Sequence, residues 1–332
     1  TDNVALGNTA LDSVEAGGTN NVAIGDNAGT AITTGDNNVA LGKDALLSTT
    51  TAANNVAIGS FSLDANTTGE SNTGIGRNSL SDNIDGTYNT AVGHNSLANN
   101  TTADNNTAMG YNALVTNTTG TNNAAFGCGA LSSTQTTNDN TGIGFDALTV
   151  NTGSNNTALG SKAFRGNQTS NDGVAVGHCA LFTNTTGASN TAVGAFALKL
   201  NTTAGRNTAV GFESLKVNTT GNSNVAVGSE ALDANTTASY NTAIGKSSLT
   251  DNTTGAANTA VGFSALKTNT EGANNVAMGC GALCLSTTGA GNNAIGRNAM
   301  CANTTGSNNT AVGLQALLAN TEGDNNVAIG KQ

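Results

Sequence analysis

Two neighbouring stretches of the chain decide the fold, because they are two copies of one unit. Residues 207–223 read NTAVGFESLKVNTTGNS, and residues 224–240 read NVAVGSEALDANTTASY. Each copy holds a short apolar stretch that ends in glycine, an Ala/Ser-Leu pair, and an Asn-Thr-Thr turn. We name the glycine after the apolar stretch the ladder glycine and number each repeat from it. Ala209 then lies at position −2 of its repeat, and Leu215 at position +4.

The same unit runs through all 332 residues. Of the 19 steps between ladder glycines, 17 are 17 residues long, the first is 18, and the step from Gly144 to Gly160 is 16. Self-similarity at a fixed period is typical of solenoids, and nearly constant spacing leaves no room for a linker. We therefore predict one continuous array of about 19 coils over residues 1–332. The ladder glycines are Gly7, Gly25, Gly42, Gly59, Gly76, Gly93, Gly110, Gly127, Gly144, Gly160, Gly177, Gly194, Gly211, Gly228, Gly245, Gly262, Gly279, Gly296, Gly313 and Gly330.

The chemistry of the unit predicts an all-β fold, a parallel β-roll or β-solenoid of 17-residue coils. Val, Ile and Thr alternating with Ala favour strands. Gly and Asn permit the left-handed backbone that tight corners need. We expect two short strands and two turns per coil, the second strand holding the Ala/Ser-Leu pair. Asn that recurs at one corner is expected to stack its side-chain amides from coil to coil.

The apolar stretch also predicts self-association. Position −1 is a large apolar residue in every copy, and position −2 is Ala in 18 of 20, the exceptions being Gly74 and Gly142. Neighbouring strand residues point to opposite faces, so one face is large and the other small. No charged residue enters the alanine position. We expect a core of large side chains inside the coil and an alanine face packed against a second chain, or the reverse.

Residues 55–59 (NVAIG), 224–228 (NVAVG) and 326–330 (NVAIG) carry a resemblance that covers essentially the whole chain. The repeat resembles the YadA-like heads of trimeric autotransporter adhesins, and similar repeats occur in viral and phage-type fibres. The resemblance implies a left-handed β-roll, a parallel homotrimer, and an extracellular, cell-surface or virion-surface location. It also implies binding to a host surface, matrix or glycan. This period is longer than the family's usual one, and no neck, stalk or membrane barrel follows.

We therefore expect a structural extracellular fibre or adhesin shaft that gives reach, stiffness and multivalent binding. Both ends of the sequence lie within a repeat, so we expect the array to continue end to end. An alternative is an ice-binding solenoid, because threonine pairs recur at coil spacing, as in Thr67-Thr68, Thr185-Thr186 and Thr202-Thr203. A segment of a viral or phage tail fibre is a further alternative.

Other classes of function lack the residues that they need. His94 and His178 lie five coils apart, acidic residues are scattered singly, and no paired carboxylates recur, so we expect no enzyme, metal or cofactor. The net charge of −10 comes without clusters of Lys and Arg, which argues against nucleic acid. No run of about 20 apolar residues is present, which argues against membrane insertion of this segment.

Three further groups of side chains are candidate sites. Cys284 and Cys301 occupy the same position in adjacent coils, about 4.8 Å apart, so they form either an inter-coil disulfide or two packed thiols. Cys128, Cys179 and Cys280 have no such partner and are expected to be free or cross-linked to another chain. Aromatic residues just after the ladder glycine are candidate outward contacts for a ligand, or else scattered surface residues: Phe61, Tyr111, Phe145, Phe196, Phe212 and Phe263.

The Asn-Thr-Thr turn also creates sequons for N-glycosylation, which predict either a stripe of sugars or a turn whose Asn takes the left-handed conformation and whose Thr caps it. We favour the turn, because Asn269 and Asn320 keep it where the sequon is lost. The sequon asparagines are Asn66, Asn100, Asn117, Asn184, Asn201, Asn218, Asn235, Asn252 and Asn303.

Overall fold

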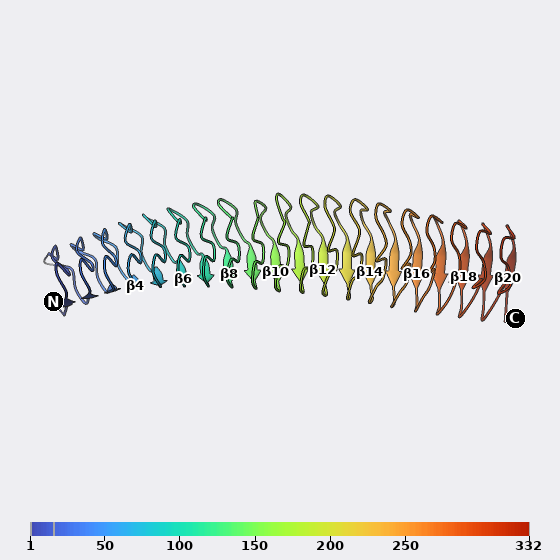
Figure 1. The fold of residues 1–332 in the computed structure, drawn as a ribbon, viewed down its shortest axis with the longest axis horizontal. Helices are drawn as coiled ribbons and strands as arrows, with labels where there is room; N and C mark the ends of the chain where they lie inside the picture. Colours follow the sequence, from blue (N-terminus) through green and yellow to red (C-terminus); the bar gives the residue numbers. More distant parts are fainter. Residues whose placement is uncertain (1, 16, 332) are drawn as a thin grey trace. The chain divides into compact units, whose positions relative to one another are not determined.

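The computed structural model describes residues 2–15 and 17–331, which form a parallel β-solenoid with one short strand per coil (Figure 1). The chain divides into two compact units, Thr1–Thr169 and Ser170–Gln332, and each is described by itself. The strands of the first unit are β1 (Val4–Leu6), β2 (Val22–Ile24), β3 (Val39–Leu41), β4 (Val56–Ile58), β5 (Thr73–Ile75), β6 (Thr90–Val92), β7 (Thr107–Met109), β8 (Ala124–Phe126), β9 (Thr141–Ile143) and β10 (Thr157–Leu159). Those of the second unit are β11 (Val174–Val176), β12 (Thr191–Val193), β13 (Thr208–Val210), β14 (Val225–Val227), β15 (Thr242–Ile244), β16 (Thr259–Val261), β17 (Val276–Met278), β18 (Asn293–Ile295), β19 (Thr310–Val312) and β20 (Val327–Ile329).

Within each unit, strands that follow one another in the sequence pair in parallel and in register. Ala209 on β13 pairs with Ala226 on β14, so equal positions of the repeat lie beside each other. The 16-residue step is absorbed outside the strand, since Thr141 still pairs with Thr157. There the turn is shortened, and the Asn151 amide donates to the Gly153 carbonyl two residues on, instead of three as in regular coils. Residues at equal positions of the repeat therefore stay paired between coils even where one coil is a residue shorter.

The prediction of two strands per coil is wrong, because the Ala/Ser-Leu segment is a series of turns. Position +4 is left-handed in every coil, with φ of 49° at Leu215, 47° at Met300 and 53° at Phe164. Position +2 is left-handed as well, as at Glu213 with φ of 56°. An extended strand cannot contain such residues. Backbone bonds between coils nevertheless continue, since the Leu215 N–H donates to the Ala231 carbonyl at 3.0 Å.

The alanine face lies inside each coil. Of the two arrangements predicted for the strand, the structure therefore has the one with alanines inside and the large residues of position −1 outside. Ala209 and Ala226 are fully buried by their own chain, and so is Leu215 at position +4. The interior is too thin for more than a methyl group there. At Gly142 even a Cβ would come within 3.2 Å of the Leu131 side chain. The large residues at position −1 consequently point outward.

Two ladders of buried asparagine complete the interior of the coils. In one, at position −4, the Asn224 N–H donates to the Asn207 side-chain oxygen at 2.9 Å, and the Asn224 amide donates to the Ala238 carbonyl at 2.9 Å. In the other, at position +7, the Asn218 amide donates to the Asn201 side-chain oxygen and to the Gly221 carbonyl, both at 3.0 Å. The predicted amide stacking is confirmed. The ladders satisfy corner backbone groups that burial would otherwise leave unpaired.

Candidate interaction surfaces

The outer face of the strands, made of positions −3 and −1, is uncharged and carries a continuous apolar row at position −1; we name it the strand face. Position −1 is Val, Ile, Leu, Met or Phe in all 20 repeats, and position −3 is Val, Thr, Ala or Asn, so neither position carries a charge. Many of these side chains are considerably exposed even between paired neighbours, for example Ile244 at 41 % and Met278 at 43 %. Large apolar patches of this kind mark interaction sites.

The aromatic candidates next to the ladder glycine lie at the surface in separate groups. Tyr111, Phe145, Phe212 and Phe263 are exposed, about half of each ring being open to solvent. Phe196 packs edge-on against Phe212 with 6.2 Å between ring centroids.

Phe61 and Phe196 are half-buried, and each ring is covered by an ammonium group. The Lys43 ammonium lies 5.4 Å from the Phe61 centroid, and the Lys199 ammonium lies 5.1 Å from the Phe196 centroid. These two rings therefore offer less free surface than the four exposed ones.

The threonine pairs present one exposed row. The first threonine of each pair donates its hydroxyl to the backbone of the next coil, as Thr185 does to the Thr202 carbonyl at 2.9 Å and Thr202 to the Thr219 carbonyl at 3.1 Å. The second threonine, such as Thr186 or Thr203, is exposed. The exposed threonines therefore form a single row with one residue per coil.

The nine sequon asparagines are all fully buried, so the sugar stripe is not at the surface. In Asn218 and Asn235 the amide nitrogen that a sugar would occupy donates two hydrogen bonds inside the coil. The favoured interpretation also needs correction, because no sequon asparagine has a positive φ. The hydrogen-bond ladder that these asparagines build explains why they recur in the repeat unit. The nine are Asn66, Asn100, Asn117, Asn184, Asn201, Asn218, Asn235, Asn252 and Asn303.

The structure brings Cys284 and Cys301 together as two free thiols. Burial, the nearby Cys301 thiol and the hydrogen bond between them raise the pKa of Cys284. Cys128 and Cys280 are exposed, whereas Cys179 is buried with its sulfur 3.4 Å from the His178 Nε2.

The two histidines have aromatic neighbours. The His94 ring stacks on Tyr111 with 5.6 Å between centroids, and His178 packs edge-on against Phe196 at 5.3 Å. Among residues 2–15 and 17–331, no group of three His, Cys, Asp or Glu side chains gathers as a metal ion would require.

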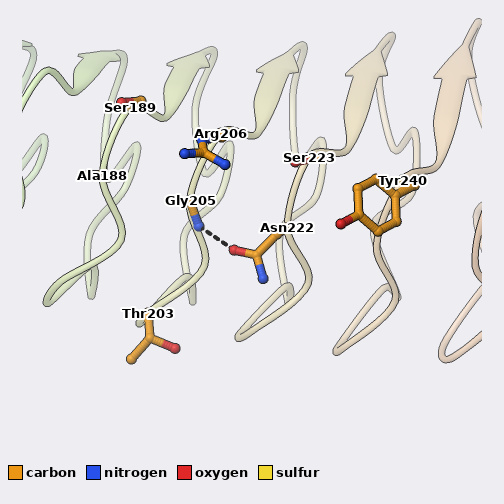
Figure 2. A pocket seen from close by; sticks show the side chains of 8 residues that line it. All are labelled: Ala188, Ser189, Thr203, Gly205, Arg206, Asn222, Ser223 and Tyr240. Atoms are coloured by element: carbon orange, nitrogen blue, oxygen red, sulfur yellow. Dashed lines mark hydrogen bonds between the residues drawn. The ribbon is translucent and has the colours of Figure 1, made fainter.

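A recess of about 440 Å³ opens in the second unit, beside the turn that leads into the strands (Figure 2). Two of its lining residues, Ala188 and Gly205, are small residues at position +11 of successive coils. The Gly205 N–H donates to the Asn222 side-chain oxygen at 2.7 Å, and this hydrogen bond links two adjacent coils within the recess. Figure 2 shows Arg206 and Tyr240 on the coils that flank Asn222. Its lining consists of Ala188, Ser189, Thr203, Gly205, Arg206, Asn222, Ser223 and Tyr240.

Arg206 and Tyr240 were not predicted as site residues from the sequence, although one feature of the repeat distinguishes them. Both lie five residues before the next ladder glycine, which is position +12 of a 17-residue coil and is left-handed in every coil, with φ of 59° and 64° here. Of its 19 occupants, all but Tyr88, Arg206, Tyr240 and Ala257 are Asn, Asp, Ser or Gly, the residues that tolerate this conformation. A large side chain at a position that small residues otherwise occupy breaks the pattern of the repeat, and such exceptions indicate a candidate binding site.

No family model matches this chain, and no curated protein matches it either. Within the part of the chain that the structure describes, no helix is long and apolar enough to cross a membrane.

Proposed function

We propose that this chain is a structural segment of an extracellular fibre or adhesin shaft, and that copies of it associate in parallel through the strand face. The observation that carries the proposal is position −1, which is apolar in 20 of 20 repeats and yet points outward. Solvent-facing positions that serve no contact vary in polarity, as position +1 does here from Asp26 to Lys43 and Phe145.

The strand face offers enough apolar surface for stable association. Full burial of a Val or Ile side chain gains about 1.5–3 kcal/mol, so covering a residue such as Ile244, which is 41 % exposed, gains roughly 0.6–1.2 kcal/mol. Because about half of the position −1 residues are less exposed than Ile244, ten coils of one unit would together gain at most roughly 6–12 kcal/mol per chain from this position. Micromolar to nanomolar binding corresponds to about 8–12 kcal/mol after the costs of association, so contacts at position −3 and from a second unit are also needed.

A second copy of this chain is the occupant that fits the strand face. Its side chains recur once per coil, at the spacing of paired strands, so an identical chain meets them coil for coil over any length. The absence of charge from positions −3 and −1 removes like-charge repulsion between copies. The resemblance to trimeric adhesin heads supports three chains, a left-handed roll and an extracellular or virion surface. The proposal assigns the chain no catalytic step, and a viral or phage fibre would use the same assembly.

Sedimentation equilibrium of the purified chain tests the proposal. We expect a trimer for the wild type and a folded monomer for the double variant Val227→Lys/Ile244→Lys, which puts charge in the strand face on β14 and β15. Thr237→Lys/Thr254→Lys is the matched control, because it adds the same two charges on exposed turns in the same unit and should leave the trimer intact. A wild type that sediments as a folded monomer at 100 μM would refute the proposal.

A further inference from the structure

We infer that the recess around Arg206 and Tyr240 binds an anionic sugar. The inference deepens the adhesin role proposed above, on which it rests, by naming a ligand class and a place. It depends on four features of the recess: its volume, an unpaired guanidinium, an exposed tyrosine ring, and hydroxyl and amide groups between them.

The recess has the size and lining of a small-ligand site. Its volume of about 440 Å³ lies within the range of about 300–1,000 Å³ typical of such pockets. Arg206 and Tyr240 lie two coils apart, which places their backbones roughly 9–10 Å from each other. One or two sugar rings span that distance.

Arg206 supplies an unused positive charge. Its guanidinium is exposed and forms no ion pair with any residue that the structure describes, and the lining of the recess contains no Asp or Glu. A planar guanidinium binds a carboxylate or a sulfate through two parallel hydrogen bonds, so the ligand should carry such a group.

Tyr240 and the polar lining suit a sugar ring. The Tyr240 side chain is 69 % exposed, and its hydroxyl is directed toward the coil of Asn222 and Ser223 (Figure 2). An open aromatic face packs against the C–H face of a pyranose, while side chains such as Ser189 and Thr203 can hydrogen-bond its hydroxyl groups.

The backbone holds the two main contacts in place. The Arg206 N–H donates to the Ala188 carbonyl at 3.0 Å, and the Tyr240 N–H donates to the Asn222 carbonyl at 3.1 Å. Their left-handed conformation costs free energy that Asn or Gly would avoid. Position +12 accepts Ser in the intervening coil, at Ser223, so neither large side chain is needed for folding.

The test measures the affinity of the full chain for three probes: 3′-sialyllactose with one carboxylate, 6-sulfated N-acetyllactosamine, and neutral lactose. We expect an anionic probe to bind and lactose to bind at least about tenfold more weakly, since a hydrogen bond to a charged group contributes roughly that factor or more. Arg206→Ser should lower the affinity about tenfold or more. Tyr240→Ser should lower it by about twofold to tenfold. Whether the carboxylate or the sulfate ester binds better identifies the natural anion.

Tyr88→Ser is the matched control. Tyr88 occupies the same left-handed position in the first unit and is 65 % exposed, but it does not line this recess. This variant should bind the anionic probe as the wild type does. Equal binding of all three probes, binding of none, or wild-type affinity in Arg206→Ser would overturn the inference. Sedimentation of the same samples separates this result from assembly, because a monomer that binds the anionic probe would refute only the trimer.

Discussion

Repair of one broken ladder tests whether buried asparagine amides stabilise this fold. At position +7 of the coil after Gly279 the ladder is interrupted by Ser286. The Asn269 side-chain oxygen, which would accept from an asparagine there, is buried without a hydrogen-bond partner, and so is the Ser286 hydroxyl. The flanking coils have the regular period of 17, so Ser286→Asn places an asparagine in a site whose backbone already suits one.

The expected gain follows from the bonds that the new side chain makes. Its amide would donate to Asn269 and to the Gly289 carbonyl, and its oxygen would accept from Asn303. Asn252, two coils earlier, makes the same three bonds with its own neighbours. Hydrogen bonds contribute about 0.5–1.5 kcal/mol each, and removing a buried unpaired group adds to this. After the cost of ordering the side chain, we expect about 1–3 kcal/mol of stabilisation.

Native-state hydrogen exchange is the suitable assay, because repeat arrays open locally and a single global free energy of unfolding averages over many coils. The amides of residues 283–304 should exchange about 5–150 times more slowly in Ser286→Asn, the factor that corresponds to 1–3 kcal/mol. Ser286→Ala is the control, since it removes the unpaired hydroxyl but leaves Asn269 unpaired, so it should slow exchange less than Ser286→Asn does. Unchanged or faster exchange in Ser286→Asn would refute the view that the ladder stabilises the coil.

Three further substitutions address other parts of the coil. Leu215→Met should lower the free energy of unfolding by less than about 1.5 kcal/mol, whereas Leu215→Ile should lower it by about 1–3 kcal/mol more, because a β-branched side chain is strained at φ of 49°. Guanidinium unfolding compares the two variants, and equal losses of stability would contradict this explanation. Gly211→Ala should destabilise by more than about 2 kcal/mol, since its Cβ would lie 2.4 Å from the Gly228 carbonyl oxygen, and hydrogen exchange of the adjacent coils should reveal it. Burial raises the pKa of Asp64 and Asp233 to about 6, so the folded state binds these protons more tightly than the unfolded state, in which Asp titrates near 3.9. Their contribution to stability therefore falls as pH rises from about 4 through 6, and replacing both with Asn should stabilise the chain at pH 7 but not at pH 4, as thermal unfolding at the two values can show.

The repeat unit predicted much of the fold, because a fixed period constrains stacking directly. The parallel strands, their register and the amide ladders follow from recurrence alone, as the pairing of Ala209 with Ala226 illustrates. The second strand was wrongly predicted, because the alternation of small and large residues does not reveal the left-handed backbone at Leu215. The residue types at position +4 do indicate it, since this position holds Leu, Gly, Phe or Met and never a β-branched residue.

The candidate sites depended on facts that a single repeat does not contain. Alternation assigned Ala209 and Val210 to opposite faces but could not tell which face is interior, since that depends on the width of the coil. The recess arises where three coils combine: Gly205 removes a side chain, and Arg206 and Tyr240 add large ones on either side. A column-by-column comparison of the repeats would have flagged all three residues, but only the stacked coils place them around one space.

The thin interior also explains why the outer surface is apolar. Because each coil has room only for alanine at position −2, the strand buries little through its inner face, where Ala209 and Ala226 each bury only a methyl group. Val and Ile favour the pleated strand backbone, so they occur at the outer position, where Val210 remains partly open to water. If strand propensity alone maintained them, Thr and Tyr, which favour strands as strongly, would share position −1, yet neither occurs there in 20 repeats. The residues at that position share apolarity rather than strand propensity, since Met and Leu replace Val at Met109 and Leu159. Contact with another apolar surface accounts for that choice.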